Sequence, residues 1–358
     1  TSSMANVIYP QVGGRYGFNR GARSLTRMSK LFFGSGFNRI EIDPVDLGGT
    51  GQSMVTSSPS IDNYYVLQDD GSYTLRTDKQ FSAAQRRALE DMVPLVRMLS
   101  ENGMLHHSQF FDSAGIEDSA NQRGLASKIF AFFGLPFHVV ERMNRQVAAM
   151  SVYELELARL RAEPDGRSDV ELQQLAAAEA VYQSQNMNGG ASLNTAPRFA
   201  QRGLGRVALM YKSYGLTVTT LLFKTARTAV INAFPDTPEG RAERDIAMRQ
   251  MMGHLGATFV MAGVAGLPMY GMASMIGNLL RDEDEIDFDE ATRLQLGELY
   301  YKGPLNALTG FEISSRTGLS GLLYRANPYM QDAGAEEQIF ALLGGPAWST
   351  GSNVVRGI

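Results

Sequence analysis

Residues 137–161 read FHVVERMNRQVAAMSVYELELARLR, and this stretch decides the fold class. Apolar side chains within it recur at intervals of three and four residues: Val140, Met143, Val147, Met150. This period predicts a long amphipathic α-helix. After a Pro-Asp-Gly turn at 164–166, Ser168 is suited to begin a second helix that runs to Ala180. Two consecutive helices of this length predict a mainly α-helical protein.

A further helix is expected to begin after Ser82, which can cap it, and to end at Asn102-Gly103. Its apolar stripe consists of Leu89, Met92, Val93, Val96 and Leu99. Pro94 lies inside this helix and predicts a kink or a break, because proline cannot donate a backbone hydrogen bond. Residues 119–133 predict another helix, which Gly134-Leu135-Pro136 is expected to interrupt.

The first 80 residues predict an irregular, Gly-rich arm. Short apolar pieces alternate there with glycine breakers: Gly13-Gly14, Gly34-Ser35-Gly36, Gly48-Gly49. Within the arm, residues 63–76 (NYYVLQDDGSYTLR) are the candidate β-hairpin. Asp70-Gly71 at their centre is a dipeptide suited to a tight turn with positive φ.

The expected architecture is a multi-helix assembly in five regions. In order, they are an irregular arm (1–80), a helical region (81–186), a flexible connector (187–197), an apolar helical region (198–280), and an acidic loop with a C-terminal helical tail (281–358). The connector is predicted because QSQNMNGGASLNTAP at 183–197 carries no charge and contains Gly-Gly and Pro.

Composition excludes several classes of protein. The 358 residues include 33 Lys+Arg and 37 Asp+Glu, so the formal net charge is −4. A polybasic nucleic-acid binder is therefore excluded for the chain as a whole, although a local basic patch is not. The absence of cysteine excludes a disulfide scaffold, a thiolate zinc site and a cysteine nucleophile.

Residues 1–40 carry a local excess of positive charge, with no acidic residue before Glu41. The cations are Arg15, Arg20, Arg23, Arg27, Lys30 and Arg39. Aromatic residues lie between them, so one interpretation is binding to DNA phosphates and bases. A docking segment for another protein is the equally open alternative.

Residues 250–280 form an uncharged run without Asp, Glu, Lys or Arg. A straight helix over residues 255–280 would be about 39 Å long, enough for a hydrocarbon core of about 30 Å. The candidate positions for membrane insertion and helix packing are Ala262, Gly266, Pro268, Ala273 and Gly277. Gly-Leu-Pro at 266–268 favours the alternative, which is a buried helix or helical hairpin in a protein core.

Two segments flank this run. Residues 205–234 predict an amphipathic helix that either faces the core or seeks a membrane surface. Residues 282–290 (DEDEIDFDE), here called the acidic run, place seven acids in nine positions. The acidic run has no glycine to form the sharp turn of a calcium loop, so we expect a solvated, self-repelling loop.

No sequence pattern for catalysis stands out. His106-His107 and Asp112 could supply metal ligands, but no third ligand follows at a helical spacing. There is no nucleophile elbow, Walker loop or zincin motif. We therefore expect a protein without an enzymatic activity, a cofactor or a metal site in this chain.

Several short motifs occur together in a fixed order. LPFHVVERMNR lies at 135–145, RVALMYK at 206–212, GPLNALTGFEISSRTG at 303–318, and GGPA at 344–347. With these motifs, roughly residues 120–358 resemble the C-terminal region of very large bacteriophage virion proteins. These are the internal or ejection proteins and the polyvalent proteins that phages package in the capsid.

The resemblance implies a structural virion protein, held inside the capsid or tail, that helps to form a conduit for genome delivery across the host cell envelope. The implied partners are portal, tail or other internal virion proteins and further copies of the chain, with the host membrane and DNA as additional ones. The alternative is a non-catalytic C-terminal anchoring domain of a giant virion-packaged enzyme, such as an RNA polymerase. An ordinary host helical protein is the third interpretation, and it requires that the motifs match by chance.

Overall fold

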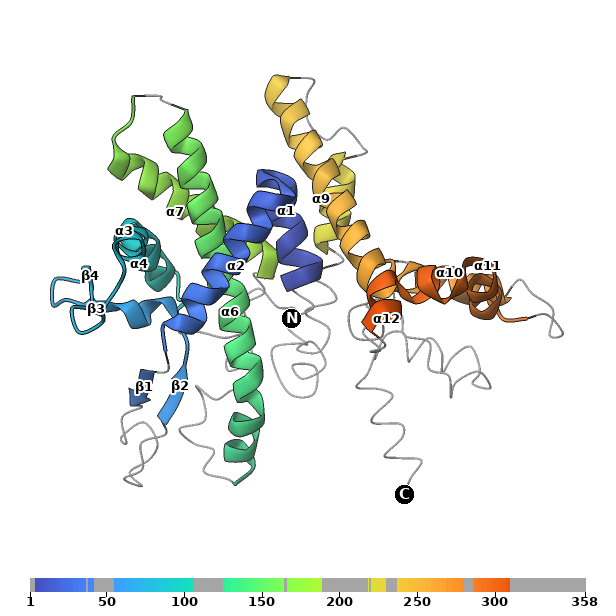
Figure 1. Ribbon diagram of the computed structural model, residues 1–358, viewed down its shortest axis with the longest axis horizontal. Helices are drawn as coiled ribbons and strands as arrows, with labels where there is room; N and C mark the ends of the chain where they lie inside the picture. The colour runs from blue at the N-terminus through green and yellow to red at the C-terminus, as the bar shows by residue number, and fades with distance from the viewer. Residues whose placement is uncertain are drawn as a thin grey trace, which may run out of the picture. The chain divides into compact units, whose positions relative to one another are not determined.

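A computed structural model describes residues 4–36, 38–41, 55–105, 125–163, 166–188, 218, 220–229, 237–268, 270–279 and 286–309 (Figure 1). The chain divides into two units. Tyr16–Ala196 form one, here called the central unit, whereas Thr1–Arg15 and Pro197–Ile358 form the other, here called the terminal unit. Helices dominate both units, which confirms the predicted mainly α fold.

Three helices frame the central unit: α2 (Phe18–Gly34), α6 (Leu125–Ala162) and α7 (Asp169–Asn188). Helix α6 packs along α7 and against α2, and the short α4 (Val93–Glu101) packs on α7. Because both α2 and α7 pack on it, the middle of α6 is buried on every side: residues 146–153 are all buried. Side chains of α6 with at most 1% exposure include Val147, Ala148, Met150, Val152 and Tyr153.

Local sequence signals set the ends of the shorter helices as predicted. The Ser82 hydroxyl accepts a hydrogen bond from the Gln85 backbone N–H at 3.3 Å, and the Gln85 side chain accepts one from the Ser82 N–H at 3.1 Å. This capping box begins α3 (Ala83–Asp91). The break expected at Pro94 is the boundary between α3 and α4, where proline occupies the first turn of the second helix.

The predicted β-hairpin is also present. Strands β3 (Tyr65–Leu67) and β4 (Tyr73–Leu75) pair antiparallel, with Val66 opposite Thr74. Gly71 has a φ of 78°, which is the left-handed conformation that an Asp-Gly turn requires.

The expectation of an irregular N-terminal arm is wrong for residues 4–34. They form η1 (Met4–Ile8), α1 (Tyr9–Tyr16) and α2. The glycines there suggested loops, but apolar residues at helical spacing bury one face of α2. A second pair of strands, β1 (Asn38–Glu41) and β2 (Val55–Ser58), was not expected either; the two pair antiparallel.

The expected interruption at Gly134-Leu135-Pro136 is also wrong, since α6 continues through these residues. A proline inside a helix removes one backbone hydrogen bond. Propagation of a helix that is 38 residues long outweighs such a local loss.

The terminal unit is built around α9 (Pro238–Ala262). The hydroxyl of Thr237 caps this helix by accepting a hydrogen bond from the Gly240 N–H at 3.2 Å. The N-terminal η1 packs on α9, and three of the other helices in the described part of the unit follow α9 in the chain. These are α10 (Tyr270–Leu279), α11 (Phe288–Lys302) and α12 (Pro304–Thr309).

The uncharged run is not one straight helix. Helix α9 ends at Ala262, Gly263 adopts a φ of 64°, and a short η5 (Val264–Gly266) precedes the half-buried Pro268. The chain therefore breaks at the Gly-Leu-Pro step and just before it, as the alternative interpretation of this run expected. Within the described ranges, no helix is both long and apolar enough to cross a membrane.

The small residues of this run have different surroundings. Ala262 and Gly266 are both buried but belong to different elements, so they form no stripe along one helix. Gly277 lies against an aromatic ring, where an added Cβ would come within 2.4 Å of the Phe288 Cδ2 atom. Ala273, one turn before it on α10, is exposed. Close packing at Gly277 is therefore between elements of the same unit.

Several predictions concern residues outside the described part of the chain. They are the metal-ligand candidates His106, His107 and Asp112, most of the connector (189–197), most of the helix expected at 205–234, the first acids of the acidic run, and the tail after Thr309. Of the predicted connector, only residues 187 and 188 are described, and they form the end of α7.

Candidate basic docking groove

The cations of α2 lie on one exposed face of that helix. Arg20, Arg23, Arg27 and Lys30 follow one another at intervals of three and four residues, which aligns them along one side. All four are exposed, because the opposite side of α2 is buried in the core of the central unit. The buried residues of α2 are Gly21, Ser24, Leu25, Met28 and Phe32.

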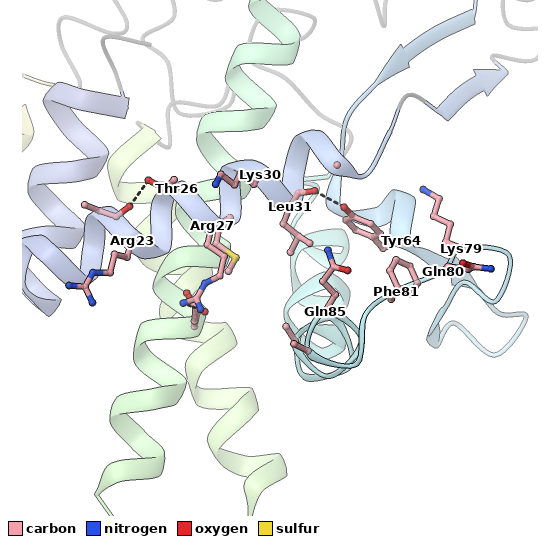
Figure 2. Close-up of a pocket in the computed structure, with 16 residues that line it drawn as sticks. Arg23, Thr26, Arg27, Lys30, Leu31, Tyr64, Lys79, Gln80, Phe81 and Gln85 are labelled. Carbon is pink, nitrogen blue, oxygen red and sulfur yellow. Dashed lines mark hydrogen bonds and ion pairs between the residues drawn. The ribbon is translucent and has the colours of Figure 1, made fainter.

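Beside this face lies an open groove of about 960 Å³ within the central unit (Figure 2). One wall is α2, with Arg23, Arg27 and Lys30; the other is the chain from Lys79 to Ala88 at the start of α3. The groove is lined by four cations and one carboxylate, which belongs to Glu154. Its apolar lining residues include Met28, Leu31, Phe81, Ala84 and Ala88. We call this site the basic groove.

One cation of the groove is already neutralised. Arg27 forms an ion pair with the Glu154 carboxylate, which also accepts a hydrogen bond of 2.6 Å from the Ser24 hydroxyl. Arg23 and Lys30, by contrast, make no hydrogen bond or ion pair with any described residue. These two side chains are available to an anionic ligand.

Lys79 and Tyr64 form the rigid end of the groove. The Lys79 ammonium donates to the backbone carbonyls of Ser35 at 2.7 Å and Asn63 at 3.2 Å, and it lies 5.3 Å from the centre of the Tyr64 ring. Burial, with a smaller contribution from the Arg76 charge, lowers the pKa of Lys79. The Lys79 ammonium adds positive charge to the groove, and its two hydrogen bonds hold the side chain in the wall.

The groove has two aromatic lining residues, Tyr64 and Phe81, and Tyr64 is held within the wall. Tyr64 is 5% exposed, and its hydroxyl donates to the Leu31 carbonyl at 2.7 Å. Burial raises the pKa of Tyr64 to about 12, so the phenol remains neutral. The Phe81 ring meets the Tyr64 ring edge-on at 5.7 Å. Stacking of nucleic-acid bases on Tyr64 would require that this packing open.

The basic groove is therefore suited to binding a ligand with both acidic and apolar groups. Two free cations supply charge attraction, and the floor supplies apolar contact. Among the described residues, no group of three or more His, Asp and Glu side chains is arranged to hold a metal ion.

The structure divides the sequence-predicted cations between the two units. Arg20, Arg23, Arg27 and Lys30 belong to the central unit, whereas Arg15 belongs to the terminal unit and lies 3.9 Å from the Glu243 carboxylate. Lys79, Phe81 and Glu154 were not predicted members of this site. The only sequence signal for Lys79 and Phe81 was their position just before the Ser82 cap, and no sequence signal pointed to Glu154.

Several described residues of the sequence motifs are used in packing, whereas others, such as Leu308, are exposed. In 135–145, Arg142 is 2% exposed and its guanidinium lies 3.7 Å from the Asp62 carboxylate, while the Arg145 carbonyl accepts a 2.8 Å hydrogen bond from the Ser184 hydroxyl. In 303–318, Gly303 allows the chain to approach the end of α9, since its added Cβ would lie 2.6 Å from the Gly263 nitrogen. These motif residues hold elements together.

A second polar cluster lies inside the terminal unit and joins η1 and α1 to α9. His254 is fully buried; its Nε2 accepts a hydrogen bond from the Gln11 amide at 2.9 Å, and its Nδ1–H donates to the Asn6 carbonyl at 2.6 Å. This assignment follows because an amide nitrogen can only donate. Burial lowers the pKa of His254 to about 4 against the weaker opposing effect of the Asn6 carbonyl. These hydrogen bonds tie η1 and α1 to α9 within the terminal unit.

No protein-family model, curated protein or solved structure shows significant similarity to this chain.

Proposed function

We propose that this protein is a non-catalytic structural component of a bacteriophage particle, packaged inside it and delivered with the genome to help form a conduit across the host cell envelope. Within this role, the central unit docks an anionic partner in the particle through the basic groove. The observation that carries this docking role is a pair of cations, Arg23 and Lys30, that pair with no described residue and lie beside apolar lining residues. Such a site favours binding and lacks paired acid and base groups for catalysis.

The phage assignment itself rests on the order of the sequence motifs. The absence of cysteine also suits a chain that must pass through a narrow tail, because no disulfide would have to be reduced and reformed.

The proposal is tested by mass spectrometry of purified phage particles before and after DNA ejection. Peptides of this chain are expected in full particles and are expected to be depleted from emptied ones. Retention in emptied particles would make it a fixed portal or tail component, and absence from both would refute the virion assignment.

The role of the groove is tested in the same particles with the double variant Arg23→Glu/Lys30→Glu. We expect its copy number per particle to fall, since charge reversal replaces attraction with repulsion. The matched control is Arg86→Glu/Arg87→Glu, which reverses two exposed cations of α3 that do not line the groove. Equal packaging of both variants and the wild type would contradict docking through the groove.

A further inference from the structure

The chain carries its own complement to the basic groove. The acidic run (282–290) places seven acids in nine positions, whereas residues 1–40 contain six cations and no acid. By sequence, the acidic run belongs to the terminal unit and the groove to the central unit. Opposite charges on two different surfaces of one chain permit reciprocal pairing between two copies.

The acidic run also matches the mixed chemistry of the groove. Its acids alternate with Ile286 and Phe288, and the groove combines cations with an apolar floor. Phe288 is engaged within its own unit, since its ring lies 6.2 Å from the Tyr270 ring. The four acids at 282–285 precede it in the sequence and supply the charge that is complementary to the groove.

We propose that the basic groove binds the acidic run of a second copy of this chain, so that two copies exchange these contacts in a symmetric dimer. This inference rests on the proposed function of the groove as a docking site. An acidic peptide is favoured over DNA because Tyr64 is buried and hydrogen-bonded, so that nucleic-acid bases could not stack on its ring without opening this packing.

The test is sedimentation velocity of the purified full chain over a range of concentrations at low and high ionic strength. We expect a concentration-dependent dimer that salt weakens, because screening acts on exposed charges. Arg23→Glu/Lys30→Glu in the groove should raise the dimer dissociation constant about tenfold or more. Glu283→Lys/Glu285→Lys in the acidic run should do the same.

The decisive variant combines both pairs of substitutions in one chain. Because the charges are exchanged, the combined variant should recover the dimer that each pair alone loses. Arg86→Glu/Arg87→Glu is the matched control and should dimerise like the wild type. A wild type that stays monomeric at every concentration, or a dimer insensitive to groove reversal, would overturn the inference.

Further outcomes separate this inference from the proposed function. A monomeric wild type that retards DNA in a gel, with loss in the groove variant, would assign the groove to nucleic acid and overturn self-association. A groove variant that dimerises normally but is not packaged would overturn the inference and leave the proposed function intact. A dimer that behaves as expected, formed by a chain absent from particles, would support the inference and refute the virion assignment.

Discussion

We expect mild acid to destabilise the terminal unit, because protonation of the buried His254 imidazole is unfavourable in the folded state. His254 is fully buried between η1 and α9, and both ring nitrogens are already used. Protonation at Nε2 would place a new N–H against the amide N–H of Gln11, 2.9 Å away. The charged form would thus lose a hydrogen bond and be buried without a counter-ion.

The magnitude follows from the pKa of His254, which burial lowers from 6.5 to about 4 in the folded state. A histidine that is harder to protonate when folded lowers stability as the pH falls, since the unfolded chain binds the proton first. Stability is therefore retained above about pH 6.5 and lost progressively between about pH 6.5 and pH 4. The expected loss is about 2 kcal/mol by pH 5 and about 3 kcal/mol by pH 4.

The assay is urea denaturation followed by circular dichroism at about pH 7.5 and pH 5, with His254→Gln as the comparison. Glutamine keeps a polar side chain at this position but does not titrate. We expect the variant to be less stable than the wild type near neutrality and the difference to shrink toward pH 5. A difference in unfolding free energy that stays constant between these two pH values would refute the reasoning.

Two packing predictions concern other buried positions. Gln146→Leu should lower the stability of the central unit by about 1–3 kcal/mol, because it leaves the buried Ile61 N–H without its 2.9 Å hydrogen bond; urea denaturation that finds the variant as stable as the wild type would contradict this. Gly263→Ala should cost at least about 2 kcal/mol, because φ is 64° and the new Cβ would lie 2.2 Å from the Tyr301 carbonyl oxygen. The matched control, Gly256→Ala, should stabilise α9 by about 0.5–1 kcal/mol, because no neighbouring atom lies within 4 Å of its Cβ; thermal melts that rank these two variants in the opposite order would refute the assignment.

Local signals predicted local structure well. Ser82 caps α3 and Pro94 opens α4, because a hydroxyl acceptor and a missing N–H act within one helical turn. Asp70-Gly71 predicted the hairpin because a positive φ is required at Gly71 itself. In each case the interaction that decides the conformation lies within a few residues of the signal.

Glycine content misled the prediction of the N-terminal arm, because a breaker has only a local cost. Helix α2 buries Leu25, Met28 and Phe32 at helical spacing, and this burial stabilises the helix despite the glycines. Residues 4–8 pack against α9, a contact with residues more than 200 positions away. No local rule could anticipate a partner so distant in the sequence.

Sequence patterns were enough to predict the helical class, the ends of α3 and α4, the hairpin, and the excess of positive charge in residues 1–40, because each depends on periodicity or on neighbouring residues. Which cations of α2 are paired depends on the fold. Glu154, on another helix, neutralises Arg27, whereas no described residue pairs with Arg23 or Lys30. The groove likewise exists only because core packing brings α2 beside the segment before α3. The sequence sets the order of charged residues along a helix, whereas their ion-pair partners depend on which apolar faces pack together in the fold.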